Sequence, residues 1–284
     1  MKWAIPAKTF LLGEYAAITG FPAIILTTSP CFELAISDDT GLRGIHPESP
    51  AGRWWLQHDF SDVGLQWHDP YHGLGGMGAS SAQFLGVYLA CNYFQKKTMC
   101  VTEMLDAYFQ SAWQGMGMRP SGYDVLAQSQ HGCVYIDGQQ AKTQIYAWPF
   151  SELAFILLHT GQKLATHHHL QALTLLDEIK PLVTIVESAR LAFELADSGR
   201  IIDAVNAYHH QLLSMNLVAE HSLNQINRLQ QHDDVLAMKG CGAMGADVLL
   251  LLTPKNRLES LKEHLSTTGL AIIATSEALY FPQM

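Results

Sequence analysis

The feature that most constrains this chain is a glycine- and serine-rich stretch, residues 72–82, which runs directly into an apolar segment ending at Phe94. Glycines allow backbone N–H groups to turn toward one point. The apolar segment predicts a buried helix, whose N-terminus presents free N–H groups and positive charge. We expect Ser80 or Ser81 to cap this helix. The stretch therefore predicts a phosphate cradle made of Gly75, Gly76, Met77, Gly78, Ala79, Ser80, Ser81 and Ala82.

Two better-known phosphate-binding motifs do not describe this stretch. The chain has no Gly-x-x-x-x-Gly-Lys-[Ser/Thr] sequence, which excludes a P-loop. Gly73, Gly75 and Gly78 fit Gly-x-Gly-x-x-Gly, but residues 67–71 do not resemble a buried strand and no acidic residue follows about 20 positions later. We interpret this second match as a coincidence of glycine content. A plain connecting loop before a helix remains the alternative.

Composition narrows the classes of partner. The chain of 284 residues has a formal net charge of −9, which argues against nucleic acid and against an anionic membrane surface. Its five cysteines form no Cys-x-x-Cys pair and predict reduced thiols in a cytoplasmic protein. The longest apolar run, 248–252, is far too short to span a bilayer. We expect small-molecule partners, and either a monomer or a homodimer.

Periodicity along the chain predicts an α+β protein of two domains, 1–150 and 151–284, with a boundary near Phe150. In the first half we expect strands over 2–10, 23–37, 42–46, 53–59, 62–67, 132–136 and 143–148, and helices over 82–94, 101–114 and 123–130. In the second half we expect strands over 153–159, 234–239, 247–252 and 270–274, and helices over 168–179, 181–197, 201–229 and 254–265. Strand, helices, two strands, helix, strand is the ferredoxin-like order.

Several other positions could carry chemistry. Asp124 follows a Pro/Gly turn, where it either caps a helix or takes a proton from a substrate hydroxyl. Lys8 lies near the end of an apolar strand, either as an edge residue or as a contact to phosphate or carboxylate. The turn 239–247 has more glycine than a hairpin needs, which indicates a close backbone approach. The run His167-His168-His169 favours a solvated surface over a metal site.

Four segments, in order and spread over nearly the whole chain, resemble the motifs of the GHMP kinases. Residues 6–16 with 20–24 resemble the first motif, 76–82 the phosphate loop, 120–124 the Pro-Ser-Gly-x-Asp segment and 239–247 the C-terminal glycine motif. The resemblance implies an N-terminal domain like the second domain of ribosomal protein S5 and a ferredoxin-like C-terminal domain. It also implies transfer of the ATP γ-phosphate to an oxygen of a small molecule.

Within that superfamily the chain is most similar to the mevalonate-pathway branch. Gly13-Glu14-Tyr15, Asp247, and Thr160-Gly161 followed by Ala165-Thr166 resemble phosphomevalonate kinases, with mevalonate kinases next. There are departures: Ala79 is inserted or replaces a glycine, Met244 and Ala246 stand where glycines are usual, and Trp113 stands where mevalonate kinases have a metal-binding glutamate. These departures leave open a non-catalytic ligand sensor on the same scaffold.

The resemblance also implies roles for individual residues. The cradle would hold the phosphates of ATP, Ser81 would ligate Mg²⁺, Asp124 would orient or deprotonate the acceptor, and Lys8 would offset charge beside it. A phosphorylated acceptor needs cationic contacts, which Arg119, His72 and Lys8 could supply, and Tyr15 could donate to a carboxylate. The remaining acceptor contacts that we expect come from the motifs themselves: Ser121, Gly122, Gly242 and Ala243.

Overall fold

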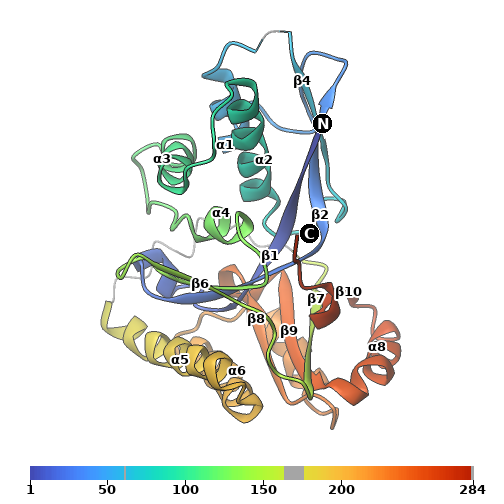
Figure 1. Cartoon of the computed structure of the whole chain (residues 1–284). Coiled ribbons are helices and arrows are strands. Elements are labelled where there is room, and N and C mark those ends of the chain that lie inside the picture. Colours follow the sequence, from blue (N-terminus) through green and yellow to red (C-terminus); the bar gives the residue numbers. More distant parts are fainter. Residues whose placement is uncertain (61, 163–175, 283–284) are drawn as a thin grey trace.

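The computed structural model describes residues 1–60, 62–162 and 176–282 and contains two β-sheets flanked by helices (Figure 1). The strands are β1 Lys2–Leu12, β2 Ala23–Ser37, β3 Gly41–Arg43, β4 Gly64–His68, β5 Cys133–Asp137, β6 Lys142–Tyr146, β7 Leu153–His159, β8 Ala237–Cys241, β9 Val248–Pro254 and β10 Ala271–Thr275. The α-helices are α1 Pro50–Leu56, α2 Ala79–Phe94, α3 Val101–Ala112, α4 Tyr123–Gln128, α5 Leu176–Leu195, α6 Ser198–Ser214, α7 Glu220–Leu229 and α8 Leu258–Ser266.

The first sheet is built around two long antiparallel strands, β1 and β2. Strand β2 pairs with β1 along most of its length and, on its other edge, with β4 and then β5, so the sheet order is β3-β4-β2-β5-β6 with β1 attached to β2. In Figure 1 these two strands run from the N-terminus at the top down to the second sheet. Helices α2 and α4 contact β1 and β2, so the sheet carries the helix that follows the glycine loop directly.

The second sheet has the order β10-β7-β9-β8, all antiparallel. In sequence order the elements are a strand, three helices, two strands, a helix and a strand, which is the ferredoxin-like arrangement predicted from the sequence. Strands β7 and β9 are almost entirely buried, as expected for central strands rich in Leu and Ile. The expected α+β architecture is confirmed.

The chain leaves the first sheet at Tyr146 and enters the second at Leu153, on either side of the boundary expected near Phe150. One continuous apolar cluster nevertheless includes residues of both halves, for example Leu12 and Tyr15 with Tyr208 and Leu250. The division into two separate domains, 1–150 and 151–284, stays a prediction. Among the described residues, no helix is both long and apolar enough to cross a membrane.

Three local predictions were wrong, each through turn or cap chemistry. Residues 53–59 were expected as a strand, but Ser49 accepts a hydrogen bond from Gly52 N at 3.1 Å and Pro50 occupies the first turn, which starts helix α1. A helix was expected to run through residue 197, but α5 ends at Leu195 and the Asp197 side chain caps the next helix, α6. The helix expected over 201–229 is divided between α6 and α7 by residues 215–219.

Some predictions fall on parts of the chain that the structure does not describe. The histidine run 167–169, the Ala165-Thr166 pair and most of the helix expected over 168–179 lie outside the described residues.

Candidate active site

The glycine loop leads into α2, and no side chain caps the N-terminus of this helix. Gly78 is the N-cap, at φ 80° and ψ 29°, and makes no side-chain cap hydrogen bond. The Ser81 hydroxyl instead points to two acceptors, Gln128 Oε1 at 2.6 Å and Gly78 O at 3.0 Å. The expected serine cap was therefore wrong. The N–H groups of the first turn have no partner within the helix. This end of α2 therefore presents donors and positive charge to an anion.

The loop is wedged between β1 on one side and the start of β9 on the other. A methyl group on Gly78 would lie 2.7 Å from Lys8 Cγ, and one on Gly76 would lie 2.6 Å from Val248 Cγ2. A methyl group on Gly75 would lie 3.2 Å from the Asp247 carboxylate. The main chain of Lys8 also donates to Met77 O at 3.0 Å. Glycine is therefore required here by close approach as well as by positive φ.

Lys8 and Asp124 form an ion pair, with Lys8 Nζ 2.7 Å from Asp124 Oδ1. Lys8 projects from the interior of β1 with its side chain 11% exposed, and Asp124 lies in the first turn of α4 with its side chain 36% exposed. The N-cap of α4 is Gly122, without a side-chain cap bond, so the interpretation of Asp124 as a helix cap was wrong. A carboxylate neutralised by a lysine, half open to solvent, can orient an acceptor or take its proton.

The C-terminal glycine turn approaches the same region and is held by hydrogen bonds from several elements. Met244, at φ 56°, donates its N–H to the Tyr15 hydroxyl at 2.8 Å. Thr160 donates from its hydroxyl to Ala246 O at 2.5 Å, and Ser222 donates to Gly245 O at 2.8 Å. Tyr15 is buried, and burial raises the pKa of its phenol to about 12. The structure thus places Tyr15 as an anchor of this turn, while a contact from Tyr15 to the acceptor stays a prediction.

Sequence reasoning missed a buried ion pair between the two sheets. Lys239 Nζ, on β8, is hydrogen-bonded to Glu14 Oε1, just after β1. Cys241 Sγ lies 3.5 Å from the same ammonium group, and the Tyr208 ring lies beneath it with the centroid 5.7 Å away. Burial raises the pKa of Glu14, although Lys239 acts to lower it. The only sequence signal was a lysine inside an apolar strand, which by itself names no partner.

The residues expected to bind the acceptor are distributed around this centre. Arg119 is exposed, with its guanidinium 4.2 Å from the Phe109 ring centroid, and lines a cleft of 410 Å³ with Ser121. The opposite wall of that cleft is residues 17–20. His72 is exposed at the start of the glycine loop, and Gly242 and Ala243 are half-buried in the C-terminal turn. The substrate contacts of these residues stay predictions.

The residues of the loop fit the phosphate groups of a nucleotide. The uncapped end of α2 presents free N–H groups, and the glycines let the loop pack closely against Lys8, Asp247 and Val248. A Mg²⁺ ion bound with a nucleotide commonly has one or two protein ligands and takes the rest from phosphate and water. Ser81, with its proton donated to Gln128, could be such a ligand. Trp113 is exposed and donates to Gly117 O at 3.2 Å, and the described residues contain no cluster of three metal-ligating side chains.

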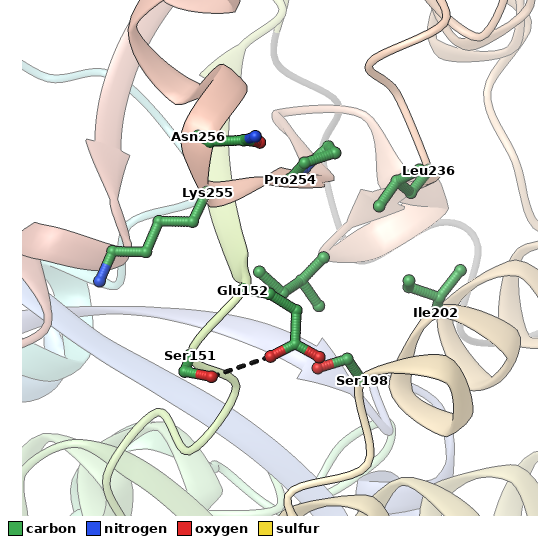
Figure 2. Close-up of a pocket in the computed structure, with 9 residues that line it drawn as sticks. Ser151, Glu152, Ser198, Ile202, Leu236, Pro254, Lys255 and Asn256 are labelled. Atoms are coloured by element: carbon green, nitrogen blue, oxygen red, sulfur yellow. Dashed lines mark hydrogen bonds between the residues drawn. The ribbon is translucent and has the colours of Figure 1, made fainter.

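A second pocket is larger but unrelated to this centre. It has a volume of 590 Å³ and is lined by C-terminal residues that include Glu152, Ser198, Leu236 and Lys255 (Figure 2). In Figure 2 the Glu152 carboxylate accepts a hydrogen bond from Ser151, at 2.9 Å. None of the motif residues lines this pocket, whereas the smaller cleft is lined by Pro120 and Ser121, which precede Asp124 in the same motif. The candidate active site is therefore the region around Lys8 and Asp124.

Gly78→Ala tests the close packing of the loop. We expect nucleotide affinity to fall at least tenfold, because the new methyl group meets the Lys8 side chain, and tenfold corresponds to about 1.4 kcal/mol. Gly73→Ala is the matched control, since Gly73 also has positive φ, at 84°, but would place its methyl group in open space. Titration calorimetry with ADP on both variants separates the contact from the backbone strain. Equal losses in the two variants would contradict the expectation.

Comparison with known proteins agrees with the architecture. No protein-family model and no curated protein sequence matches the chain. Among solved structures, mevalonate kinase of Methanococcus jannaschii superposes with a TM-score of 0.78 at 14% identity, over 99% of this chain and 98% of that one. Phosphomevalonate kinase of Streptococcus pneumoniae superposes with a TM-score of 0.79 at 16% identity, over 97% and 98%. Galactokinase of Lactococcus lactis, in complex with galactose, gives 0.74 at 10%, over 95% and 92%.

These similarities extend over both sheets rather than one, although few residues are identical. They confirm the fold that the four motifs predicted from sequence. The chain has the two-part fold of the GHMP kinases.

Proposed function

We propose that this protein is an ATP-dependent small-molecule kinase that phosphorylates phosphomevalonate. The observation that carries the proposal is the Lys8–Asp124 ion pair, which lies against Gly78 of the phosphate loop. Phosphoryl transfer requires mainly positioning and charge neutralisation. The loop and the end of α2 would hold the phosphates of ATP, and Lys8 and Asp124 would hold the acceptor oxygen in line with them. When bound, Mg²⁺ would offset negative charge on the phosphate oxygens.

The choice of acceptor rests on charge. A phosphorylated acceptor brings two or more negative charges, which cationic side chains stabilise. Arg119 lines the cleft close in sequence to Asp124, and Lys8 is at the centre of the site. One of the similar solved structures is a phosphomevalonate kinase in complex with phosphomevalonate and AMPPNP, with a TM-score of 0.78. Mevalonate is the second candidate, since the mevalonate kinase of Methanococcus jannaschii superposes with a TM-score of 0.78 as well.

The decisive assay offers the purified protein ATP and Mg²⁺ with mevalonate, phosphomevalonate, galactose and homoserine in turn. We expect ADP to form fastest with phosphomevalonate. Faster turnover with mevalonate would reverse the choice between the two acceptors. Nucleotide binding without turnover on any acceptor would support the alternative of a ligand sensor, which the replacements at Trp113, Met244 and Ala246 favour. If the protein neither binds nucleotide nor turns over any of the four acceptors, both the kinase and the ligand-sensor interpretations are contradicted.

Arg119→Ala tests the acceptor charge. If the acceptor is phosphorylated, the variant should raise the KM for phosphomevalonate about tenfold or more, because a charged hydrogen bond contributes about 1.5–3 kcal/mol. The KM for ATP should remain almost unchanged. Arg257→Ala, in the C-terminal half, is the control for loss of an exposed arginine. An unchanged KM for phosphomevalonate would remove Arg119 from the acceptor site and leave the kinase assignment intact.

A further inference from the structure

Gln128 is a buried polar residue that none of the four motifs includes. It ends α4 with only 2% of its surface exposed, and its side chain makes three contacts. Its amide nitrogen donates to Pro6 O at 2.8 Å and to Gly78 O at 3.2 Å. Its carbonyl oxygen accepts from the Ser81 hydroxyl at 2.6 Å. One side chain therefore touches β1, the glycine loop and the first turn of α2.

The orientation of this amide follows from its partners. Two of them are main-chain carbonyl oxygens, which only accept, so the NH₂ group must face them. The carbonyl oxygen is then directed at the Ser81 hydroxyl, which lies 2.6 Å from it and 3.0 Å from Gly78 O, so the shorter of its two contacts as a donor is to Gln128. The Ser81 oxygen accepts no hydrogen bond among those that the structure describes. Gln128 thus fixes the hydrogen-bonding state of Ser81 as well as its position.

Helix α4 also carries Asp124, one member of the ion pair with Lys8. Asp124 and Gln128 are four residues apart on α4 and so lie on one face of that helix. Asp124 contacts the Lys8 side chain and Gln128 contacts the Pro6 carbonyl oxygen, so this face of α4 meets β1 at two nearby points. The acceptor side of the site and the phosphate loop are therefore joined through one face of α4. A shift of the loop by even a fraction of an ångström would be resisted by the Gln128 contacts with Gly78 and Ser81.

We propose that Gln128 is a positioning residue that holds Gly78 and Ser81 of the phosphate loop in register with the Lys8–Asp124 pair. The inference rests on the proposed function, because this alignment affects turnover only if the protein is a kinase. Its effect on nucleotide phosphates can be measured without turnover. Glutamine is suited to the task because its amide offers two donors and one acceptor, whereas a carboxylate would face the Pro6 and Gly78 carbonyl oxygens with acceptors only.

The test uses Gln128→Met, which keeps the length of the side chain and removes all three hydrogen bonds. ADP binding by calorimetry, with and without Mg²⁺, should weaken about tenfold, while the KM for the acceptor stays within twofold. Gln130→Met is the matched control, because Gln130 is two residues further on and bonds only to Ser129 among the described contacts. If Gln128→Met does not fold, Gln128→Glu keeps the acceptor toward Ser81 and loses the donors, and should show the same loss of ADP affinity.

A double-mutant cycle with Ser81→Ala identifies the route of the effect. If Gln128 acts through Ser81, the double variant should bind ADP little more weakly than the worse single variant. A Gln128→Met protein with a lowered Tm and an ADP affinity within twofold of wild type would overturn the inference and leave a structural role. Wild-type protein that binds ADP without transferring phosphate would refute the proposed function alone. Wild-type protein that binds no ADP would overturn both.

Discussion

Replacing Asp124 with asparagine is expected to lower kcat about a thousandfold while the protein stays folded. Asparagine keeps the volume of the side chain but can neither hold a negative charge beside Lys8 nor accept a proton. The ion pair is partly solvent-exposed, so its loss should cost at most about 1 kcal/mol of folding free energy. Steady-state rates measured beside a thermal melt separate the two effects. Asp106→Asn, on the exposed face of α3, is the control.

The size of the Asp124→Asn effect should also depend on the acceptor. A hydroxyl group must lose its proton during transfer, whereas the second pKa of a phosphate monoester is about 6, so this group is already ionised at neutral pH. With mevalonate, Asp124 would act as a base, and with phosphomevalonate it would mainly position Lys8. We therefore expect a larger loss with mevalonate than with phosphomevalonate. Activity near wild type with both acceptors would remove Asp124 from the chemistry.

What could be predicted from sequence was largely local. Glycine content followed by an apolar segment predicted the loop that leads into helix α2, and the order of strands and helices predicted the ferredoxin-like half. Glycines at 76 and 78 indicate a close approach directly, because a Cβ there would lie under 3.0 Å from a neighbouring side chain and φ is positive at both. The strand predicted over 53–59 was wrong because the start signal of α1, Ser49 followed by Pro50, lies before this segment.

What could not be predicted depends on residues far apart in the chain. Gln128 acts on Pro6, 122 positions away, and on Ser81, 47 positions away. Glu14 and Lys239 are 225 positions apart. A single sequence shows that Lys239 interrupts an apolar strand, but the identity of its counter-charge follows from how the two sheets pack. Tyr15 illustrates the same limit, since its phenol proves to be buried against the C-terminal turn.

Lys239→Met is expected to destabilise the protein by about 3–5 kcal/mol, because it leaves the Glu14 carboxylate buried without its partner. Denaturant unfolding at neutral pH measures the loss. The control is Lys262→Met: Lys262 pairs with Glu259 on the surface of α8, at 2.9 Å, and its loss should cost less than about 1 kcal/mol. A cost for Lys239→Met as small as that of the control would contradict a buried charge pair.

A second substitution, Glu14→Gln, decides whether the loss of stability in Lys239→Met comes from the unpaired charge or from altered packing. In the Lys239→Met background it removes the stranded charge, so the double variant should be more stable than Lys239→Met alone, despite one more change in the core. If it is not, the loss comes from packing around Tyr208 rather than from charge. The outcome bears on the site, because Glu14 follows the strand that carries Lys8 and Lys239 precedes the turn that reaches the glycine loop. A stable double variant with weak turnover would show that the ion pair serves alignment of the two halves beyond its contribution to folding.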